Sequence, residues 1–278
     1  MRKYLLFVGI LTMALAFNSC SRSDDEPDGN GKTGSSQITI TEYQWKFGER
    51  SSFGELYERY TYNKNNNLTE FESNYCYRSD IGRFPQSTTY KYDAQNHLIE
   101  KNDYSLTLLN YKYKYTFNGI DSIATMQKYS KEGDLIENWI YTYDSQRRLI
   151  QAKEIYDFII PYVDDYTYNG NNVTVVRHRS DTGELFGTEL YEYDNHYNLL
   201  KKTWTNGDTG KKDIEDDNEY TYNSKGQLTR MVSHAYVFTT ELTYKDYTYN
   251  SDGTIQRIHL SYSFKTDQSD LDYSYTKL

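Results

Sequence analysis

The stretch Tyr191-Glu192-Tyr193-Asp194-Asn195-His196-Tyr197-Asn198-Leu199 contains the unit from which this chain is built. Alternating tyrosines lead into a polar cluster, and an apolar run resumes at Leu199. Tyr-x-Tyr followed by Asp or Asn, or a close variant, occurs nine times, with gaps of 25 to 30 residues, starting at Tyr60, Tyr90, Tyr115, Tyr141, Tyr166, Tyr191, Tyr220, Tyr247 and Tyr273. A period of this size indicates one supersecondary unit stacked on copies of itself.

Each unit has the features of a β-hairpin. Asp and Asn at a turn start can bond the backbone two residues on, while Gly and Asn tolerate a positive φ. One turn position holds such a residue in four copies, Asn66, Asn96, Gly226 and Gly253, whereas Arg147 and Tyr197 depart from the rule. Two loops read as shortened, at Asn169-Gly170 and at Asn118-Gly119, the strongest two-residue hairpin signal in the chain. We expect two antiparallel strands of about eight to ten residues per unit.

Parity along the strands predicts which side chains face a core. One alternating set after the turns is apolar and contains Ile150, Ala152, Leu200, Trp204, Met231, Ile258 and Leu260. The intervening set is polar and contains Glu70, Glu72, Lys201, Thr203, Arg257 and His259. Before one turn, Trp139, Tyr141 and Tyr143 form a stripe of period two. The pattern predicts an aromatic and aliphatic face toward a core and a charged face toward water.

These hairpins, with an opening strand near Ile38 to Phe47, predict an all-β fold: an antiparallel up-and-down meander of roughly 16–18 strands. Such a sheet must curl or close to hide one face. It either closes as a flattened barrel or remains a curled sheet. An outer-membrane barrel needs an apolar exterior band roughly 25 Å tall, whereas mean hydropathy here is −0.90. We therefore expect a water-soluble sheet with an aromatic interior, formed as a single domain by residues 37–278.

The first 19 residues have the features of a lipoprotein signal peptide. Arg2 and Lys3 precede an apolar run from Tyr4 to Phe17, which is too short to span a bilayer comfortably. Ser19-Cys20 resembles a lipobox, which predicts lipidation at Cys20 and membrane attachment through that lipid. An ordinary secretory signal with an incidental Cys20 is the alternative.

Residues 20–36 are polar and predict a disordered acidic tether. Their acidic cluster, Asp24, Asp25, Glu26 and Asp28, is similar to signals that send some Gram-negative lipoproteins to the outer leaflet of the outer membrane. We expect a lipid-anchored protein of the outer membrane, exposed at the cell surface. A plain acidic linker is the alternative, and the leaflet stays open.

The net charge of −9 argues against nucleic acid as a partner. Cys76 remains the single thiol once Cys20 is lipidated, so it reads as a small buried apolar residue.

No pattern in the sequence points to catalysis. The histidines at 97, 178, 196, 234 and 259 lack the close spacing of a metal site, and we interpret them as solvated. The acidic run 213–219 could attract calcium, but it lacks the central glycine of an EF-hand loop and reads as a solvated acidic edge. Nucleophile elbows and phosphate-binding glycine loops are also missing from the sequence. The expectation is a protein that is not an enzyme and that has no cofactor and no metal.

Three tryptophans are candidate ligand contacts, because planar rings on an exposed rim can stack on sugars: Trp45, Trp139 and Trp204. Parity also places each of them among apolar neighbours, so core packing is the alternative.

The turn motif resembles the YD repeat of RHS-type bacterial surface and toxin-shell proteins, whose consensus is close to Tyr-Asp-x-x-Gly-Arg-Leu. Tyr143 to Leu149 matches it at every defined position except the glycine, where Arg147 stands. In length the chain is more similar to a family of anchored Gram-negative surface lipoproteins of unknown function, described as porin-like in fold. That resemblance implies a β fold and an envelope location, and no activity.

Two functional hypotheses follow. The first is a surface-anchored, non-enzymatic lipoprotein that serves as an interaction or structural module, for example with a surface protein as partner. The second is a glycan-binding or small-ligand-binding protein that uses an aromatic cavity or rim. A tightly filled interior would favour the first, and an open cavity lined by Tyr and Trp the second. The oligomeric state stays open.

Overall fold

The computed structural model describes residues 35–46, 49–78, 82–155, 161–235, 241–263 and 268–277. The predicted signal peptide, Cys20 and nearly all of the tether lie outside these ranges. So do the side chains of Trp45 and Cys76. Across the described ranges there is no apolar helix of membrane-spanning length.

All regular structure in these residues is β-strand. The strands are β1 (Ser36–Lys46), β2 (Glu49–Arg50), β3 (Glu55–Tyr62), β4 (Leu68–Arg78), β5 (Gly82–Tyr92), β6 (Leu98–Ser105), β7 (Leu108–Phe117), β8 (Ile123–Ser130), β9 (Leu135–Tyr143), β10 (Leu149–Glu154), β11 (Tyr162–Asn169), β12 (Asn172–Arg179), β13 (Leu185–Tyr193), β14 (Leu199–Asn206), β15 (Lys212–Tyr222), β16 (Leu228–Ala235), β17 (Glu241–Tyr249), β18 (Ile255–Tyr262) and β19 (Gln268–Lys277).

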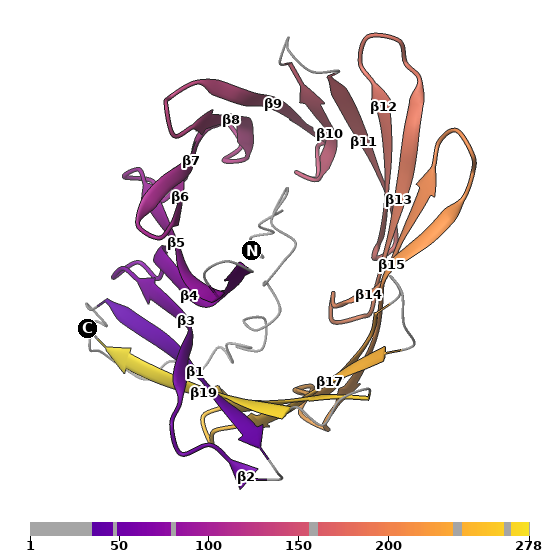
Figure 1. The fold of residues 1–278 in the computed structure, drawn as a ribbon. Helices are drawn as coiled ribbons and strands as arrows, with labels where there is room; N and C mark the ends of the chain where they lie inside the picture. The colour runs from indigo at the N-terminus through magenta and orange to yellow at the C-terminus, as the bar shows by residue number, and fades with distance from the viewer. Residues whose placement is uncertain are drawn as a thin grey trace, which may run out of the picture.

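The sheet closes into a barrel through its first strand (Figure 1). From β3 to β19 each strand pairs antiparallel with the next, and β1 pairs with both β3 and β19. Ile40 thereby lies opposite Glu58 on one side and Tyr273 on the other. Apart from the two-residue β2, eighteen strands make the wall. The predicted all-β meander is confirmed, and of the two alternatives the sheet adopts the closed barrel.

The turns form as the Asp and Asn positions predict. Asp144 Oδ1 accepts bonds from the backbone nitrogens of Gln146 at 2.8 Å and Arg148 at 2.9 Å. The backbone nitrogen of Arg147 bonds the carbonyl of Asp144 at 3.0 Å, and Arg147 has φ 63°. Tyr197 also has φ 63°. Both residues therefore adopt the left-handed conformation that glycine provides at 226 and 253.

One turn prediction is confirmed and one is wrong. Asn169 pairs with Asn172, which leaves a two-residue loop as expected. Asn118-Gly119 does not form such a loop, because Asn118 Oδ1 instead accepts from the nitrogens of Ile120 and Ser122. This is the longer loop of the other units, with Asp121 at φ 58°.

Arg147→Gly should stabilise the protein by about 0.5–1 kcal/mol, because a left-handed conformation costs an L-residue roughly 1–2 kcal/mol and the gain in unfolded-state entropy offsets part of the relief. Urea unfolding followed by tryptophan fluorescence measures the change. Gly253→Ala is the matched control and should destabilise by about 1 kcal/mol. A Cβ there meets its nearest neighbour at 3.6 Å, so the cost is in the backbone rather than in a clash. Equal stabilities would contradict the strain at Arg147.

A β-bulge recurs beside the second aromatic residue of the unit, which is Phe117 in one copy and tyrosine in the others, where the register shifts in seven hairpins. A bulge disrupts the strand ladder locally. The next unit's second tyrosine donates its hydroxyl to the carbonyl of the apolar residue that follows the turn, in the pairs Tyr92–Leu68 (2.7 Å), Tyr168–Leu149 (2.8 Å), Tyr249–Leu228 (2.7 Å) and Tyr275–Ile255 (2.9 Å). The repeated tyrosine therefore joins one hairpin to the one before it.

Two apolar clusters pack against the inside of the wall. One joins Ile40 of β1 to Ile255, Ile258, Leu260 and Leu271 of β18 and β19. The other joins Tyr141, Leu149 and Ala152 of β9 and β10. The parity prediction is wrong for Ile150, because the bulge between Leu149 and Gln151 leaves Leu149 buried and Ile150 exposed.

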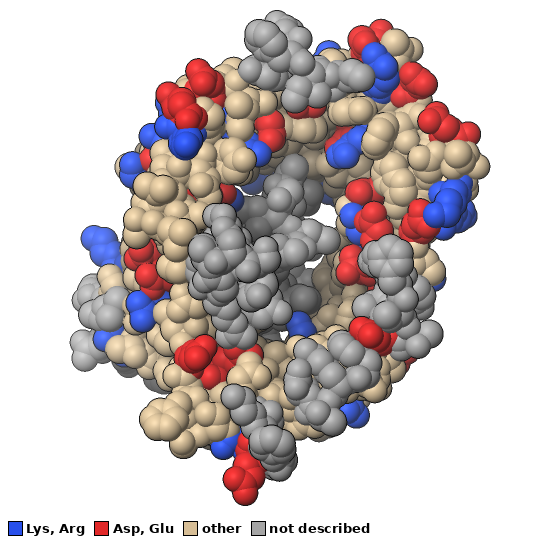
Figure 2. Space-filling view, viewed as in Figure 1, with Lys and Arg blue, Asp and Glu red and all other residues tan. Residues whose placement is uncertain are grey.

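The outer face of the wall is polar, as predicted. Ion pairs cross between neighbouring strands at Arg59–Glu72 (2.8 Å), Lys91–Glu100 (2.7 Å) and Arg230–Asp246 (3.1 Å). Figure 2 shows charged side chains distributed around the outer margin. A charged lysine or arginine facing lipid at mid-membrane costs roughly 2–4 kcal/mol. This face is therefore built for contact with water.

An outward-facing cluster of charges, the closure cluster, joins the ends of the barrel sheet. Asp270 of β19 is 1% exposed. Its carboxylate lies 2.8 Å from Arg50 Nε, 3.5 Å from Arg257 Nη1 and 2.7 Å from His259 Nδ1. Asp272 also pairs with Arg50 at 2.5 Å and Arg257 at 2.6 Å. Arg50 belongs to β2, whereas its partners in the cluster belong to β18 and β19. The cluster therefore links the first strands of the sheet to the last ones and stabilises the closed barrel.

Candidate functional site: the inner wall of the barrel

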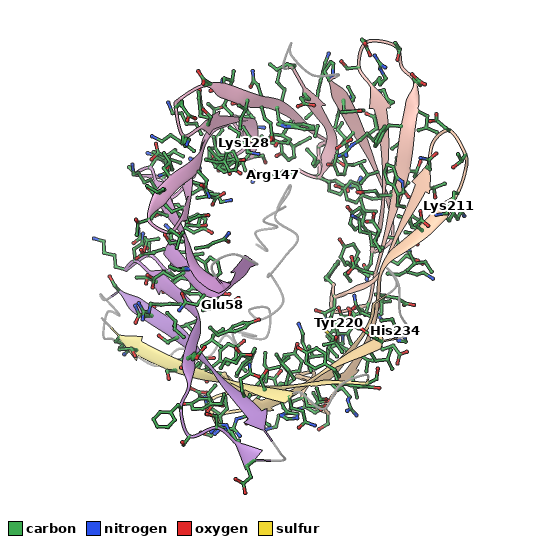
Figure 3. The ribbon with its side chains drawn as sticks, viewed as in Figure 1. Glu58, Lys128, Arg147, Lys211, Tyr220 and His234 are labelled. Carbon is green, nitrogen blue, oxygen red and sulfur yellow. The ribbon has the colours of Figure 1, made fainter. Side chains whose placement is uncertain are left out.

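The two tyrosines of each unit face the inside of the barrel. In Figure 3, Tyr220 and Glu58 point toward the centre of the ring. The residue between the two tyrosines alternates to the outside. It is exposed in seven copies: Lys91, Thr116, Thr142, Thr167, Thr221, Thr248 and Ser274. We call the inward-facing side chains the inner wall.

The described side chains form the wall of a ring in Figure 2. A circular barrel of this many strands is too wide for its side chains to fill. The inward tyrosines are mostly half-buried, with Tyr141 the buried exception. The inner wall therefore combines the two packed clusters with stretches that remain open to solvent.

The inner wall carries fixed ion pairs, which corrects the expectation of a purely aromatic and aliphatic interior. Arg177 holds Asp164 with two bonds of 2.7 Å each. Lys202 lies 3.2 Å from Glu189 and 2.6 Å from Glu215. Further inward pairs are Lys101–Asp103 (3.0 Å) and Lys128–Glu137 (2.6 Å). These charges share faces with the tyrosines, because Lys101 lies opposite Tyr90 and Lys202 opposite Tyr191.

The inward lysines also lie over tyrosine rings. Lys101 Nζ is 4.5 Å from the centroid of Tyr113, Lys128 Nζ is 4.5 Å from Tyr111, and Lys202 Nζ is 5.4 Å from Tyr191. Within about 6 Å, a cation is attracted to the face of the ring. Lysine, carboxylate and tyrosine thus recur as a mixed aromatic and ionic lining.

Burial sets the ionisation of this lining. It raises the pKa of Tyr92 and Tyr143 to about 12, and it raises the pKa of Tyr191 further still. Burial also raises the pKa of Glu58, although the hydroxyl of Tyr60 donates a 2.6 Å bond to its carboxylate. At neutral pH the tyrosines are therefore neutral hydrogen-bonding groups.

Sequence reasoning missed the ionic part of the lining. It comes partly from the residue two before each Tyr-x-Tyr, which shares their inward face. This position holds Glu58, Thr88, Tyr113, Trp139, Asp164, Glu189, Asn218, Lys245 and Leu271. Because the residue type changes from copy to copy, the pattern shows no consensus. Extending the tyrosine parity by one step would have placed these side chains on the inner face, although not their ion-pair partners.

The candidate tryptophans separate in the structure. Trp139 packs against the cluster of Tyr141, Leu149 and Ala152, which is the core-packing alternative. The ring centroids of Trp204 and Phe186 are 5.6 Å apart, and the side chain of Phe186 is exposed. Trp204 therefore adjoins an accessible aromatic surface. The backbone of Trp45 pairs with Arg50 and Gln268, and its side chain lies outside the described part.

Two of the histidines make packed or buried contacts, whereas Asp213, Glu215 and Glu219 of the acidic run are exposed. His97 stacks on Phe117 at 4.5 Å and lies 3.0 Å from Asp93, and His259 contacts the buried Asp270. In the acidic run, Glu215 pairs with the inward Lys202. Within the described ranges, no group of three His, Cys, Asp or Glu side chains could hold a metal ion.

No family model matches the sequence, and no curated protein matches it. The resemblance to the YD repeat therefore stays a prediction. Solved structures do match. A porin-like protein from Bacteroides uniformis is 12% identical over 89% of this chain and 98% of its own, with a TM-score of 0.41. A porin-like protein from Bacteroides vulgatus is 11% identical over 69% of this chain and 95% of its own, with a TM-score of 0.38. A chain of the TcdB2-TccC3-Cdc42 structure is 13% identical over 86% of this chain, with a TM-score of 0.34, and the match spans 15% of that chain.

Proposed function

We propose that this is a non-enzymatic cell-envelope protein that binds an extended polar ligand, of the glycan class, along its inner wall. The observation that carries the proposal is the mixed lining of half-buried tyrosine rings and fixed ion pairs on the inner wall. Aromatic faces stack on sugar rings, while tyrosine hydroxyls, lysines and carboxylates can hydrogen-bond sugar hydroxyls. Because most of the inward tyrosines are half-buried and keep some exposed surface, the lining favours ligand binding over a purely structural module.

A binding role suits the state of the inward charges better than catalysis. General acid or base catalysis needs a group free to exchange its proton near the working pH. Asp164 is held by both arms of Arg177, and Glu189 accepts from Tyr191 at 2.5 Å while it pairs with Lys202. Such groups orient a ligand without reacting with it.

We further propose attachment to the outer membrane through lipid on Cys20, with the barrel exposed at the cell surface. The signal sequence and the polar outer face support this placement, since the barrel wall is suited to water. Cys20→Ala should move the protein from the membrane fraction to the soluble fraction, as followed by immunoblot. Retention of the variant in the membrane would contradict the anchor.

A glycan array with the detergent-solubilised full-length chain tests the ligand class. Lys101 and Lys91 form a matched pair, because they lie on adjacent strands but face opposite sides of the wall. Lys101→Ala, on the inner wall, should weaken binding to the strongest glycan by about tenfold, which corresponds to about 1.4 kcal/mol. Lys91→Ala, on the outer face, should leave it unchanged. Silence across the array, or equal effects of both variants, would overturn the proposal.

A further inference from the structure

We propose that Tyr162, Phe186 and Trp204 form a stacking platform for one pyranose ring of an uncharged glycan. This inference rests on the proposed function and assigns a specific subsite to it. The platform lies on β11, β13 and β14, which lie on one side of the ring in Figure 1. Tyr162 and Phe186 are at the start of β11 and β13 and Trp204 is near the end of β14, so the platform is at the end of the barrel away from the Tyr-x-Tyr turns. Register places Tyr162 and Trp204 on the same face as the inward Asp164 and Glu189.

The three rings form a continuous aromatic surface. The ring centroids of Tyr162 and Phe186 are 5.1 Å apart, and those of Phe186 and Trp204 are 5.6 Å apart, with tilted planes in both pairs. Phe186 is 47% exposed and its neighbour Leu185 is 42% exposed. An exposed phenylalanine set between two other rings offers a face to a ligand rather than to a core.

Three features hold this aromatic surface in place: a β-bulge, the contact of the Trp204 ring with a glycine, and a backbone hydrogen bond to Phe186. Arg177 pairs with Gly187 and His178 with Leu185, so Phe186 is the extra residue of a β-bulge, a feature that can redirect a side chain. A Cβ at Gly187 would lie 2.2 Å from the Trp204 ring, so the ring rests directly on glycine backbone. The nitrogen of Gly207 bonds the carbonyl of Phe186 at 2.9 Å. The platform is therefore held in place before any ligand arrives.

A small polar pocket adjoins the platform. It has a volume of about 170 Å³ and is lined by Tyr162, Arg179, Glu184, Leu185, Phe186 and Asp208. Pockets that enclose a whole drug-sized ligand have roughly 300–1,000 Å³. This pocket is smaller, which suits a single ring of a longer chain.

The charges around the pocket select the kind of sugar. Arg179 is already bonded to both carboxylate oxygens of Asp181, at 3.1 and 2.8 Å. Glu184 and Asp208 add two more negative charges to the pocket lining. The resulting excess of carboxylates favours hydroxyl donors and repels a sugar acid. A protein partner fits less well, because a stable interface buries about 800 Å² on each side.

Isothermal titration of the detergent-solubilised full-length chain tests the subsite. The probes are hexasaccharides of glucose, mannose and N-acetylglucosamine, with hexagalacturonate as the acidic comparison. We expect at least one uncharged hexasaccharide to bind more tightly than hexagalacturonate. Phe186→Ala should weaken that binding about tenfold, and Trp204→Phe should weaken it in the same direction. Phe53→Ala removes a more exposed phenylalanine ring elsewhere, 85% against 47% for Phe186, and should change the affinity less than twofold.

The outcomes separate the subsite from the wider proposal. Wild-type affinity in both Phe186→Ala and Trp204→Phe would overturn the platform while glycan binding along the inner wall stands. Tighter binding of hexagalacturonate than of the uncharged probes would overturn the assigned sugar class. Failure of the wild-type protein to bind any probe, together with silence on the array, would overturn both.

Discussion

Above about pH 10, the barrel should unfold in one cooperative transition instead of losing tyrosine protons one at a time. Burial raises the pKa of nearly every tyrosine of the repeated unit, to about 12 for Tyr92 and Tyr143. Burial also raises the pKa of the following tyrosines: Tyr60, Tyr62, Tyr90, Tyr115, Tyr141, Tyr166, Tyr168, Tyr191, Tyr193, Tyr220, Tyr222, Tyr247, Tyr249 and Tyr273.

The sign of the effect follows from linkage. A tyrosine whose folded pKa exceeds the unfolded value of about 10 binds its proton more tightly in the folded state. Its contribution to stability is complete below about pH 10 and is lost as the pH rises toward the folded pKa. Each such group removes up to about 1.4 kcal/mol per pH unit. Since solvent screens the half-buried rings, the loss of stability per ring is smaller than this. The losses from many rings, added together, still exceed the free energy of unfolding of a typical domain, about 5–15 kcal/mol.

Absorbance at 295 nm, which reports tyrosinate, and far-ultraviolet circular dichroism should therefore change together in one steep step. The same pH series in concentrated urea gives the unfolded reference, which should titrate smoothly near pH 10. A smooth folded-state titration near pH 10, with the β signal intact, would mean that burial does not raise the tyrosine pKa values and would contradict the half-burial of the rings in the inner wall.

Local structure could be predicted from the sequence because short-range chemistry decides it. Asp144 and its equivalents set the turns, and the alternation around Tyr141 sets the strand faces. The prediction of a two-residue loop at Asn118-Gly119 was wrong because the side chain of Asn118 accepts backbone hydrogen bonds that form a longer loop. Ile150 misled because a bulge shifts strand parity by one residue.

Closure of the sheet and the pairing of the inward charges depend on the register between strands, which local patterns do not contain. The register of Ile40 with Tyr273 joins residues from opposite ends of the chain. The Lys202–Glu189 pair depends on the register between β13 and β14. Trp204 was a candidate from its residue type, whereas Phe186 could not be predicted because only the bulge exposes it. The site was therefore visible in its aromatic part and hidden in its charges.

Asp270→Ala should destabilise the protein by about 3–5 kcal/mol, the usual cost of removing one partner from a buried ion pair. Asp270 is 1% exposed and faces two arginines, Arg50 and Arg257, together with His259. Without its carboxylate, two guanidinium groups lie close together and Asp272 alone compensates them.

Urea unfolding of the full-length chain, followed by circular dichroism, measures this loss. Asp246→Ala is the matched control, because Asp246 pairs with Arg230 on the exposed outer face, where an ion pair contributes about 0–1 kcal/mol. Limited proteolysis provides a second readout. Loss of the Asp270 carboxylate leaves Asp272 as the partner that links Arg50 of β2 to β19, so this link weakens and cleavage of Asp270→Ala should begin near the ends of the barrel sheet. Equal stabilities of the two variants would show that backbone pairing of β1 with β3 and β19 closes the barrel without this cluster.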